Sequence, residues 1–357
     1  MSLVLSSVRD TLYAVTSCCF PNPTIHINRR TFKVIKLLGE GGFSYVHLVQ
    51  DTSTGRYFAL KKIRCQFGTD SVKDAMKEVD MYRLFSHENI IKVIDTCVVQ
   101  DKNGGKIVYI FLPYYKSGNL QDAIDSNLEH DRHFSEKEML KIFRGICYAV
   151  RALHTYKFPS VLRSENGTTN LNVNGMENGM NNSISSQFNN SQSEDDVVPF
   201  AHRDIKPGNI LLSDDSQPIL MDFGSLVRAR IKIQTRNEAL MQQDLAGQHS
   251  TMPYRAPELF DVKTNIELDE KVDIWSLGCT LYAMAYGSSP FDNSINEQGG
   301  SIALAVLNAQ FRFPANDKYS QEFKDLISFM LKVEPKERPD IHQVIAKVDT
   351  QLEQLGS

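Results

Sequence analysis

We predict an α+β fold for this chain from three features of its sequence. With 357 residues, 41% of them hydrophobic, the chain is long enough to form two lobes around one cleft. Residues 32–38 and 46–49 have the side-chain pattern of strands, and a glycine-rich turn lies between them. Residues 71–85 repeat apolar side chains mostly at steps of three and four, which is typical of a helix.

The turn between the first two predicted strands is a candidate phosphate-binding loop. Gly39, Gly41 and Gly42 allow backbone N–H groups to approach phosphate oxygens closely. Ser44 stands where the pattern G-x-G-x-x-G has its third glycine, so the match is incomplete. On its own, a turn of this composition is more often only a tight hairpin.

A third predicted strand, residues 57–61, ends in a lysine. Residues on a strand alternate between its two faces, so Lys61 and Lys62 point in opposite directions. The match of this strand to the pattern V-A-I-K selects Lys61 as the cation for the α- and β-phosphates of a nucleotide. Glu78, within the predicted helix, is its candidate partner, and the alternative is an ordinary solvated carboxylate.

A further predicted strand, residues 107–112, runs into a short linker that can contact adenine. Pro113 can offer its carbonyl, and Tyr115 can offer both its N–H and its carbonyl. The missing N–H of proline therefore does no harm at this position.

The most specific segment of the chain is AHRDIKPGNILL at 201–212, followed by MDFG at 221–224. It provides the four side chains that phosphoryl transfer from a metal-bound nucleotide requires, Asp204, Lys206, Asn209 and Asp222. Asp204 would accept or orient the proton of the acceptor hydroxyl, and Lys206 would reach the transferred phosphoryl oxygens. Asn209 and Asp222 offer the hard oxygen ligands that Mg²⁺ prefers.

Taken in order, these motifs resemble those of eukaryotic protein kinases from about residue 31 to residue 352. Within that superfamily the chain resembles the Numb-associated kinases, and in particular the palmitoylated serine/threonine kinase 16 branch, with a fungal member tied to the vacuole membrane as the nearest likeness. The segments that carry this resemblance are 39–46, 78–85, 218–225, 251–260 and 273–284.

The resemblance implies a bilobal fold, with a small β-rich lobe over 31–113 that has one regulatory helix and a larger, mainly helical lobe over 116–352. It implies a serine/threonine protein kinase that transfers the γ-phosphoryl group of ATP to protein hydroxyls, autophosphorylates and uses Mg²⁺. ATP contacts are then expected at Leu38, Gly39, Glu40, Gly41, Gly42, Phe43, Ser44, Val46, Ala59, Lys61, Leu112, Pro113, Tyr114, Tyr115, Asn209, Leu211 and Asp222.

The segment TMPYRAPE at 251–258 matches the end of a kinase activation segment. In this family Glu258 is expected to form a structural ion pair with Arg338. Thr251 together with Lys206 favours serine or threonine as the acceptor over tyrosine.

The sequence indicates regulation through the activation segment less clearly than it indicates the catalytic residues. Arg203 is the cation that often meets a phosphate on this segment. Residues 225–250 contain no compelling phosphosite, and Thr235 and Ser250 are candidates only. Residues 237–246 have the pattern of a capped helix. A helix that is already ordered there would make the enzyme active without an upstream kinase.

Two segments fall outside the predicted core. Residues 157–198 are rich in Asn, Ser and Gly and cannot bury enough apolar surface to fold. We therefore expect a disordered insert before residues 201–212, which we call the catalytic loop. This insert either carries regulatory phosphosites or is a neutral expansion.

The N-terminal segment, residues 1–30, is expected to anchor the chain to a membrane. Cys18 and Cys19 form an adjacent pair that is a candidate for double S-palmitoylation, and Ser2 excludes N-myristoylation. They follow a short apolar stripe of Leu5, Val8, Leu12 and Val15. The alternative is a helix that packs on the small lobe, with two inert cysteines. Anchoring places the enzyme at the cytosolic face of endomembranes, at the vacuole or the Golgi.

Three further expectations concern partners and alternatives. The formal charge of −4 gives no reason to expect a nucleic-acid partner, and we expect a monomer that acts on protein substrates. A nucleotide-binding scaffold that acts by docking is the second candidate function, because Ser44 weakens the glycine-rich loop. A lipid or small-molecule kinase on the same fold is a third.

Overall fold

The computed structural model describes residues 23–40, 44–65, 68–101, 104–157, 197–292, 301–315 and 317–356. The predictions for Cys18, Cys19, Gly41, Gly42 and Phe43, and those for the N-terminal stripe and for 158–196, lie outside these residues. The chain divides into two compact units, Met1–Lys116 and Ser117–Ser357. The first is built on a β-sheet and the second mainly on helices, so the prediction of an α+β fold is confirmed.

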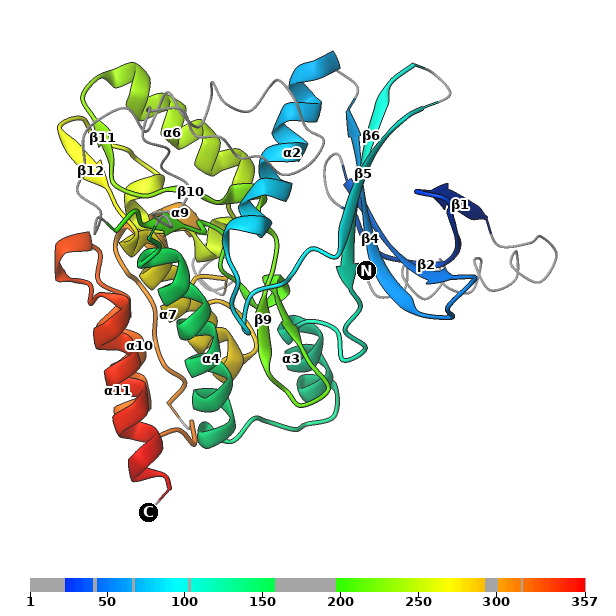
Figure 1. The fold of residues 1–357 in the computed structure, drawn as a ribbon. Coiled ribbons are helices and arrows are strands. Elements are labelled where there is room, and N and C mark those ends of the chain that lie inside the picture. The colour runs from blue at the N-terminus through cyan, green and yellow to red at the C-terminus, as the bar shows by residue number, and fades with distance from the viewer. Residues whose placement is uncertain are drawn as a thin grey trace. The chain divides into compact units, whose positions relative to one another are not determined.

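The first unit contains a six-stranded antiparallel sheet in the order β1-β2-β3-β4-β6-β5 (Figure 1). Its strands are β1 Thr24–Ile27, β2 Arg30–Glu40, β3 Ser44–Asp51, β4 Tyr57–Cys65, β5 Asp95–Gln100 and β6 Lys106–Pro113. The predicted strands at 32–38, 46–49, 57–61 and 107–112 are therefore confirmed. The pairing of β2 with β3 shifts register between Val34 and Lys36 and again between Leu37 and Gly39, where β2 approaches the glycine-rich turn.

The two faces of this sheet have different neighbours. On one face a buried apolar cluster includes Phe32, Leu60 and Phe111. Helix α2, Gly68–Leu84, contacts β4 and β6, and its Glu78 bonds to Lys61. Lys61 and Leu60 are neighbours on β4, so helix and cluster lie on opposite faces of the sheet. We call the face of Leu60 the outer face.

The second unit is dominated by helices. They are α3 Leu120–Glu129, α4 Glu136–His154, α6 Arg236–His249, α7 Lys271–Tyr286, α9 Ile302–Leu307, α10 Gln321–Met330 and α11 Ile341–Gln354. Helices α4, α7, α10 and α11 pack side by side (Figure 1). Most of α7 is buried, and Trp275 at its centre stacks on Phe291 with ring centroids 5.4 Å apart.

Several of these helices begin at sequence signals that explain their start. Ser135 precedes α4, Thr235 precedes α6 and Asp340 precedes α11, and each accepts a hydrogen bond from the backbone N–H three residues further on. In all three the third helical residue bonds back to the N-cap backbone, which satisfies a second N–H that the helix leaves unpaired. The predicted helix at 237–246 is confirmed as part of α6.

Three two-stranded ribbons complete the second unit. They are β7 Phe200–Ala201 with β10 Val227–Arg228, β8 Ile210–Leu212 with β9 Pro218–Leu220, and β11 Ile231–Ile233 with β12 Ile266–Leu268. Strand β11 belongs to the activation segment, residues 222–258, and β12 belongs to the chain that precedes α7. This pairing fixes the segment on the N-terminal side of α6.

The segment between α4 and β7 leaves and re-enters the second unit at neighbouring points. Lys157 and Val197 form an isolated antiparallel bridge. Val198 N donates to Tyr156 O at 2.8 Å. The backbone is therefore closed across the two ends of residues 158–196.

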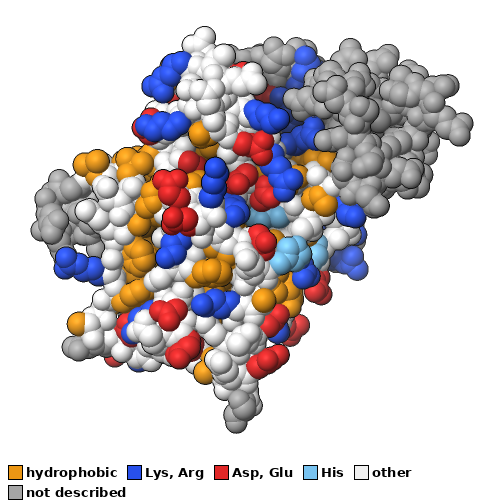
Figure 2. Space-filling view, turned by 90° about the vertical axis from the view of Figure 1, so that its left-hand side faces the viewer, with side chains coloured by type: hydrophobic (Ala, Val, Ile, Leu, Met, Phe, Trp, Pro, Cys, Tyr) orange, Lys and Arg blue, Asp and Glu red, His pale blue; other side chains and the backbone are white. Residues whose placement is uncertain are grey.

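The surface that Figure 2 shows carries charges of both signs. Lys and Arg side chains are intermingled there with Asp and Glu side chains, and apolar side chains gather in several places between them. Within the described residues, no helix has the length and apolar content needed to cross a membrane.

Candidate active site

In the first unit the predicted pair of Lys61 and Glu78 is formed. Lys61 Nζ lies 2.6 Å from Glu78 Oε1, with both side chains nearly buried. The hydroxyl of Tyr82, one turn further along α2, donates to the same oxygen at 3.1 Å. Tyr82 lies within the predicted helix 71–85, and its hydroxyl was not among the predicted site groups.

The strand register gathers other predicted nucleotide contacts on the face of Lys61. Val46 is paired with Lys61 and Ala59 with Leu112, so these four side chains share one face of the sheet. The remaining predicted contacts in this unit lie at two ends of the sheet. Leu38, Gly39 and Glu40 end β2, Ser44 begins β3, and Pro113 to Tyr115 end or follow β6.

In the second unit the predicted site residues Lys206 and Asn209, together with Thr251, contact the carboxylate of Asp204. Its Oδ2 lies 2.8 Å from Lys206 Nζ and accepts a 2.8 Å hydrogen bond from Asn209 Nδ2. Its Oδ1 accepts from the backbone N–H of Thr251 at 2.8 Å. Lys206 Nζ also donates to Thr251 Oγ1 at 2.5 Å. The spacing of the motifs did not show that Thr251, 47 residues downstream, holds Asp204 directly.

This arrangement orients Asp204 and gives the site a cation. The two donors on Oδ2 and the one on Oδ1 hold the carboxylate plane in one orientation. A carboxylate held in this way can receive or orient the proton of a hydroxyl, and Lys206 beside it can balance the charge of a phosphoryl group.

Asn209 and Asp222 are suited to hold Mg²⁺. Asn209 uses its Nδ2 to bond Asp204, which orients its carbonyl oxygen as the available ligand atom. Met221 N donates to Asn209 O at 3.0 Å, so the backbone brings Asp222 next to Asn209. Asp222 has a left-handed backbone, with φ 64°. Mg²⁺ usually takes one or two protein oxygens together with substrate phosphates, and this pair fits that requirement.

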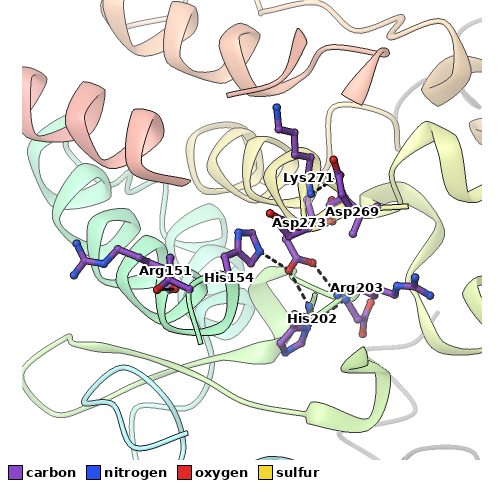
Figure 3. A network of polar contacts seen from close by, with 12 residues as sticks. Arg151, His154, His202, Arg203, Asp269, Lys271 and Asp273 are labelled. Carbon is purple, nitrogen blue, oxygen red and sulfur yellow. Dashed lines mark hydrogen bonds and ion pairs between the residues drawn. The ribbon is translucent and has the colours of Figure 1, made fainter. Parts of the chain in front are cut away.

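The backbone of the catalytic loop is bound by a fully buried carboxylate, that of Asp273 on α7. Its Oδ2 accepts from the backbone N–H of His202 at 2.8 Å, and its Oδ1 accepts from that of Arg203 at 2.8 Å. His154 Nε2, from the last turn of α4, lies 2.9 Å from the same Oδ2 (Figure 3). Burial acts to raise the pKa of Asp273, but the hydrogen bond and charge of His154 outweigh it and keep the pKa below its ordinary value.

Arg203 is paired with a neutral side chain. Its Nη1 donates to Oε1 of Gln242 on α6 at 2.9 Å, and both residues are buried. Burial lowers the pKa of Arg203. Arg203, the expected cation for a phosphate on the activation segment, thus binds Gln242, a residue of the predicted helix 237–246 with no sequence signal for this contact.

The ion pair that we expected between Glu258 and Arg338 is confirmed. Two parallel hydrogen bonds of 2.7 Å join the guanidinium to the two carboxylate oxygens. Arg338 is fully buried and also donates to the backbone carbonyls of Lys332, Val333 and Lys271. The pair therefore ties the end of the activation segment to the loop before α11.

Comparison with known proteins gives the class of this chain. The model of the protein kinase domain matches residues 32–159 and 197–348, and the chain belongs to this family. The two matched stretches contain the pairs and networks described above.

Similar proteins define the branch. The chain is 38% identical to serine/threonine-protein kinase ppk13 of Schizosaccharomyces pombe, over 97% of each protein. It is 34% identical to serine/threonine-protein kinase ENV7 of Saccharomyces cerevisiae, over 94% of this chain and 96% of that one. It is 34% identical to human serine/threonine-protein kinase 16, over 93% of this chain and 94% of the human protein. The chain is thus a serine/threonine-protein kinase of the kinase 16 branch.

Replacement of Asp273 tests the support of the catalytic loop. In Asp273→Asn an amide nitrogen replaces one carboxylate oxygen, so a backbone N–H of the loop or His154 loses its acceptor in a buried place. We expect the free energy of unfolding to fall by about 3–5 kcal/mol. Urea unfolding measures this, with Asp261→Asn, an exposed aspartate, as a control expected to change by less than about 0.5 kcal/mol. Equal stability of the two variants would contradict the role of Asp273.

Proposed function

We propose that this serine/threonine kinase transfers the γ-phosphoryl group of Mg·ATP to protein hydroxyls, with Asp204 as the base. The observation that carries the proposal is the set of contacts around Asp204, which orients the carboxylate and places Lys206 and Asn209 against it. We further propose that the enzyme acts at the cytosolic face of endomembranes, in trafficking or morphology of the vacuole.

The roles of the residues follow from their contacts. Asp204 would orient the acceptor hydroxyl and take its proton as the new bond forms. Lys206 would neutralise charge on the transferred group, and the Lys61 ammonium, held by Glu78, would bind the α- and β-phosphates. Asn209 and Asp222 would hold Mg²⁺, which when bound neutralises the phosphate charges.

Thr251 gives a reason for preferring small aliphatic hydroxyls as acceptors. Its side chain bonds Lys206 while its backbone bonds Asp204, so it forms one wall of the place where the acceptor would lie. A protein acceptor fits this arrangement better than a lipid or a small molecule, because the segment after Thr251 is the peptide platform of the family.

The activity of Asp204→Asn tests whether Asp204 acts as the base. Asp204→Asn keeps the size of the side chain but removes its basicity, and we expect autophosphorylation with Mg·ATP to fall by about 10²- to 10⁴-fold. Asp215→Asn, an exposed aspartate of the turn between β8 and β9, is the control and should keep full activity. Equal incorporation of phosphate by Asp204→Asn and the control would contradict the role of Asp204, and no incorporation by the wild type would favour the nucleotide-binding scaffold.

We also propose that the activation segment is ordered without phosphorylation. The side-chain carbonyl of Gln242 accepts a hydrogen bond from the guanidinium of Arg203. A capping box of Thr235 and Glu238 caps the N-terminus of helix α6. Thr251, at the end of the segment, is bonded to the catalytic loop. These contacts do the work that a phosphate does in kinases that require one.

Phosphatase treatment tests whether the activation segment is ordered without phosphorylation. Protein made in bacteria and then dephosphorylated should keep its activity towards a Ser/Thr substrate. Gln242→Ala leaves Arg203 buried without its acceptor, so we expect activity to fall about tenfold, whereas Gln248→Ala on the exposed side of α6 should have no effect. Full loss of activity on dephosphorylation would refute the proposal.

Membrane anchoring is proposed on the adjacent Cys18 and Cys19. Two acyl chains hold a protein on a membrane stably, whereas one chain gives only reversible binding. We expect palmitate labelling of the wild type, about half as much in Cys18→Ser or Cys19→Ser, and none in the double variant, which should become cytosolic. Cys97→Ser, in the sheet of the first unit, is the control. Undiminished labelling of the double variant would rule out this anchor.

A further inference from the structure

The outer face of the sheet carries basic side chains that the nucleotide chemistry does not use. We call His47 on β3 and Lys62 and Arg64 on β4 the outer basic cluster. Lys62 and Arg64 are two residues apart on one strand, so they share a face, and it is the face opposite Lys61. His47 is paired with Leu60 of the same face.

Two tyrosines flank this cluster. The strand register places Tyr45 and Tyr109 on either side of Lys62, as its partners on β3 and β6. The guanidinium of Arg64 lies over the ring of Tyr45, 5.6 Å from its centroid. Tyr45 is half-buried and Arg64 is exposed. Tyr109 is buried in the apolar cluster of this face, so the surface combines positive charge with one amphipathic ring, that of Tyr45.

The charges of the cluster are not neutralised by ion pairs. Among the residues that the structure describes, neither Lys62 nor Arg64 forms a salt bridge, and His47 Nδ1 is buried without a hydrogen-bond partner. Burial and the charge of Arg64 lower the pKa of Lys62, although Asp101 acts against this. Burial and the charge of Lys62 lower the pKa of His47. An anion placed against the cluster would relieve this repulsion.

The two units also differ in charge. The first has 16 Lys and Arg against 10 Asp and Glu, whereas the second has 23 against 33. The formal charge of −4 for the whole chain hides this difference. An anionic surface would therefore attract the first unit and repel the second.

We propose that the outer basic cluster docks on the anionic surface of a membrane. The proposal rests on the membrane location proposed above, and its test needs no acyl chains. Cys19 precedes the first residue of β1, Thr24, by five residues, which span at most about 18 Å when extended. An anchor at Cys18 and Cys19 would thus keep the first unit within reach of the lipid headgroups.

The chemistry of the cluster fits lipid headgroups. Basic side chains bind anionic headgroups through their charge, and tyrosine rings favour the interface between headgroups and acyl chains. Docking would add an electrostatic contact to the anchor and turn one face of the first unit towards the membrane. The face of Lys61, where we place the nucleotide, is the opposite one.

Vesicle binding by the full-length, unacylated protein tests this proposal. The protein is Cys18→Ser/Cys19→Ser made in bacteria, and the probes are vesicles of phosphatidylcholine alone and of phosphatidylcholine with phosphatidylserine. We expect binding to the second kind only, weakened by salt. Adding Lys62→Gln/Arg64→Gln should weaken it by about thirtyfold, at about fivefold per basic residue, and Arg64→Gln alone by about fivefold.

A matched pair of lysines provides the control. Lys73→Gln/Lys77→Gln changes the net charge by the same amount at exposed positions of α2 and should leave binding unchanged. Autophosphorylation of each variant shows that it is folded. Equal weakening by the control pair, unchanged binding of Arg64→Gln, or wild-type binding that does not need phosphatidylserine would each overturn the proposal. Palmitate labelling is independent of all these outcomes.

Discussion

The structure of the catalytic loop depends on one buried carboxylate, that of Asp273. A charge this deep in a protein is stable only if donors surround it, and here two backbone N–H groups and one imidazole do so. The hydrogen bonds from the backbone N–H groups of His202 and Arg203 to Asp273 hold Arg203 at a φ of 65°. This left-handed conformation is unfavourable for an arginine. The same bend directs Asp204 towards Lys206, Asn209 and Thr251, so the position of this candidate base depends on the charge of Asp273 on α7.

The activation segment is held by a second set of contacts, two with the catalytic loop and one with the chain just before α11. Gln242 bonds Arg203, Thr251 bonds Asp204 and Lys206, and Glu258 bonds Arg338. The segment is therefore tied to the catalytic loop at two points and to the α11 side of the unit at a third. A change at Thr251 would act on Asp204 directly, and a change at Gln242 would act on its neighbour Arg203.

Sequence reasoning predicted the contiguous features well, because strands, helices and motif spacings are local patterns. The strands around the glycine-rich turn, the helix with Glu78 and the capped helix within the activation segment are examples. The contacts that it did not predict join residues far apart in the chain. Gln242 lies 39 residues from Arg203, and His154 lies 119 residues from Asp273. Neither contact follows from periodicity, since only the folded backbone brings these residues together.

The bridge between Lys157 and Val197 has a consequence for how this chain can vary. Because the backbone is already closed there, the fold fixes the points at which the chain between Lys157 and Val197 begins and ends. The entropy of closing a loop grows only with the logarithm of its length, so doubling the segment would cost about 0.6 kcal/mol. The length of the chain at this position therefore has little effect on the free energy of unfolding, whereas loss of the Asp273 carboxylate is expected to lower it by about 3–5 kcal/mol.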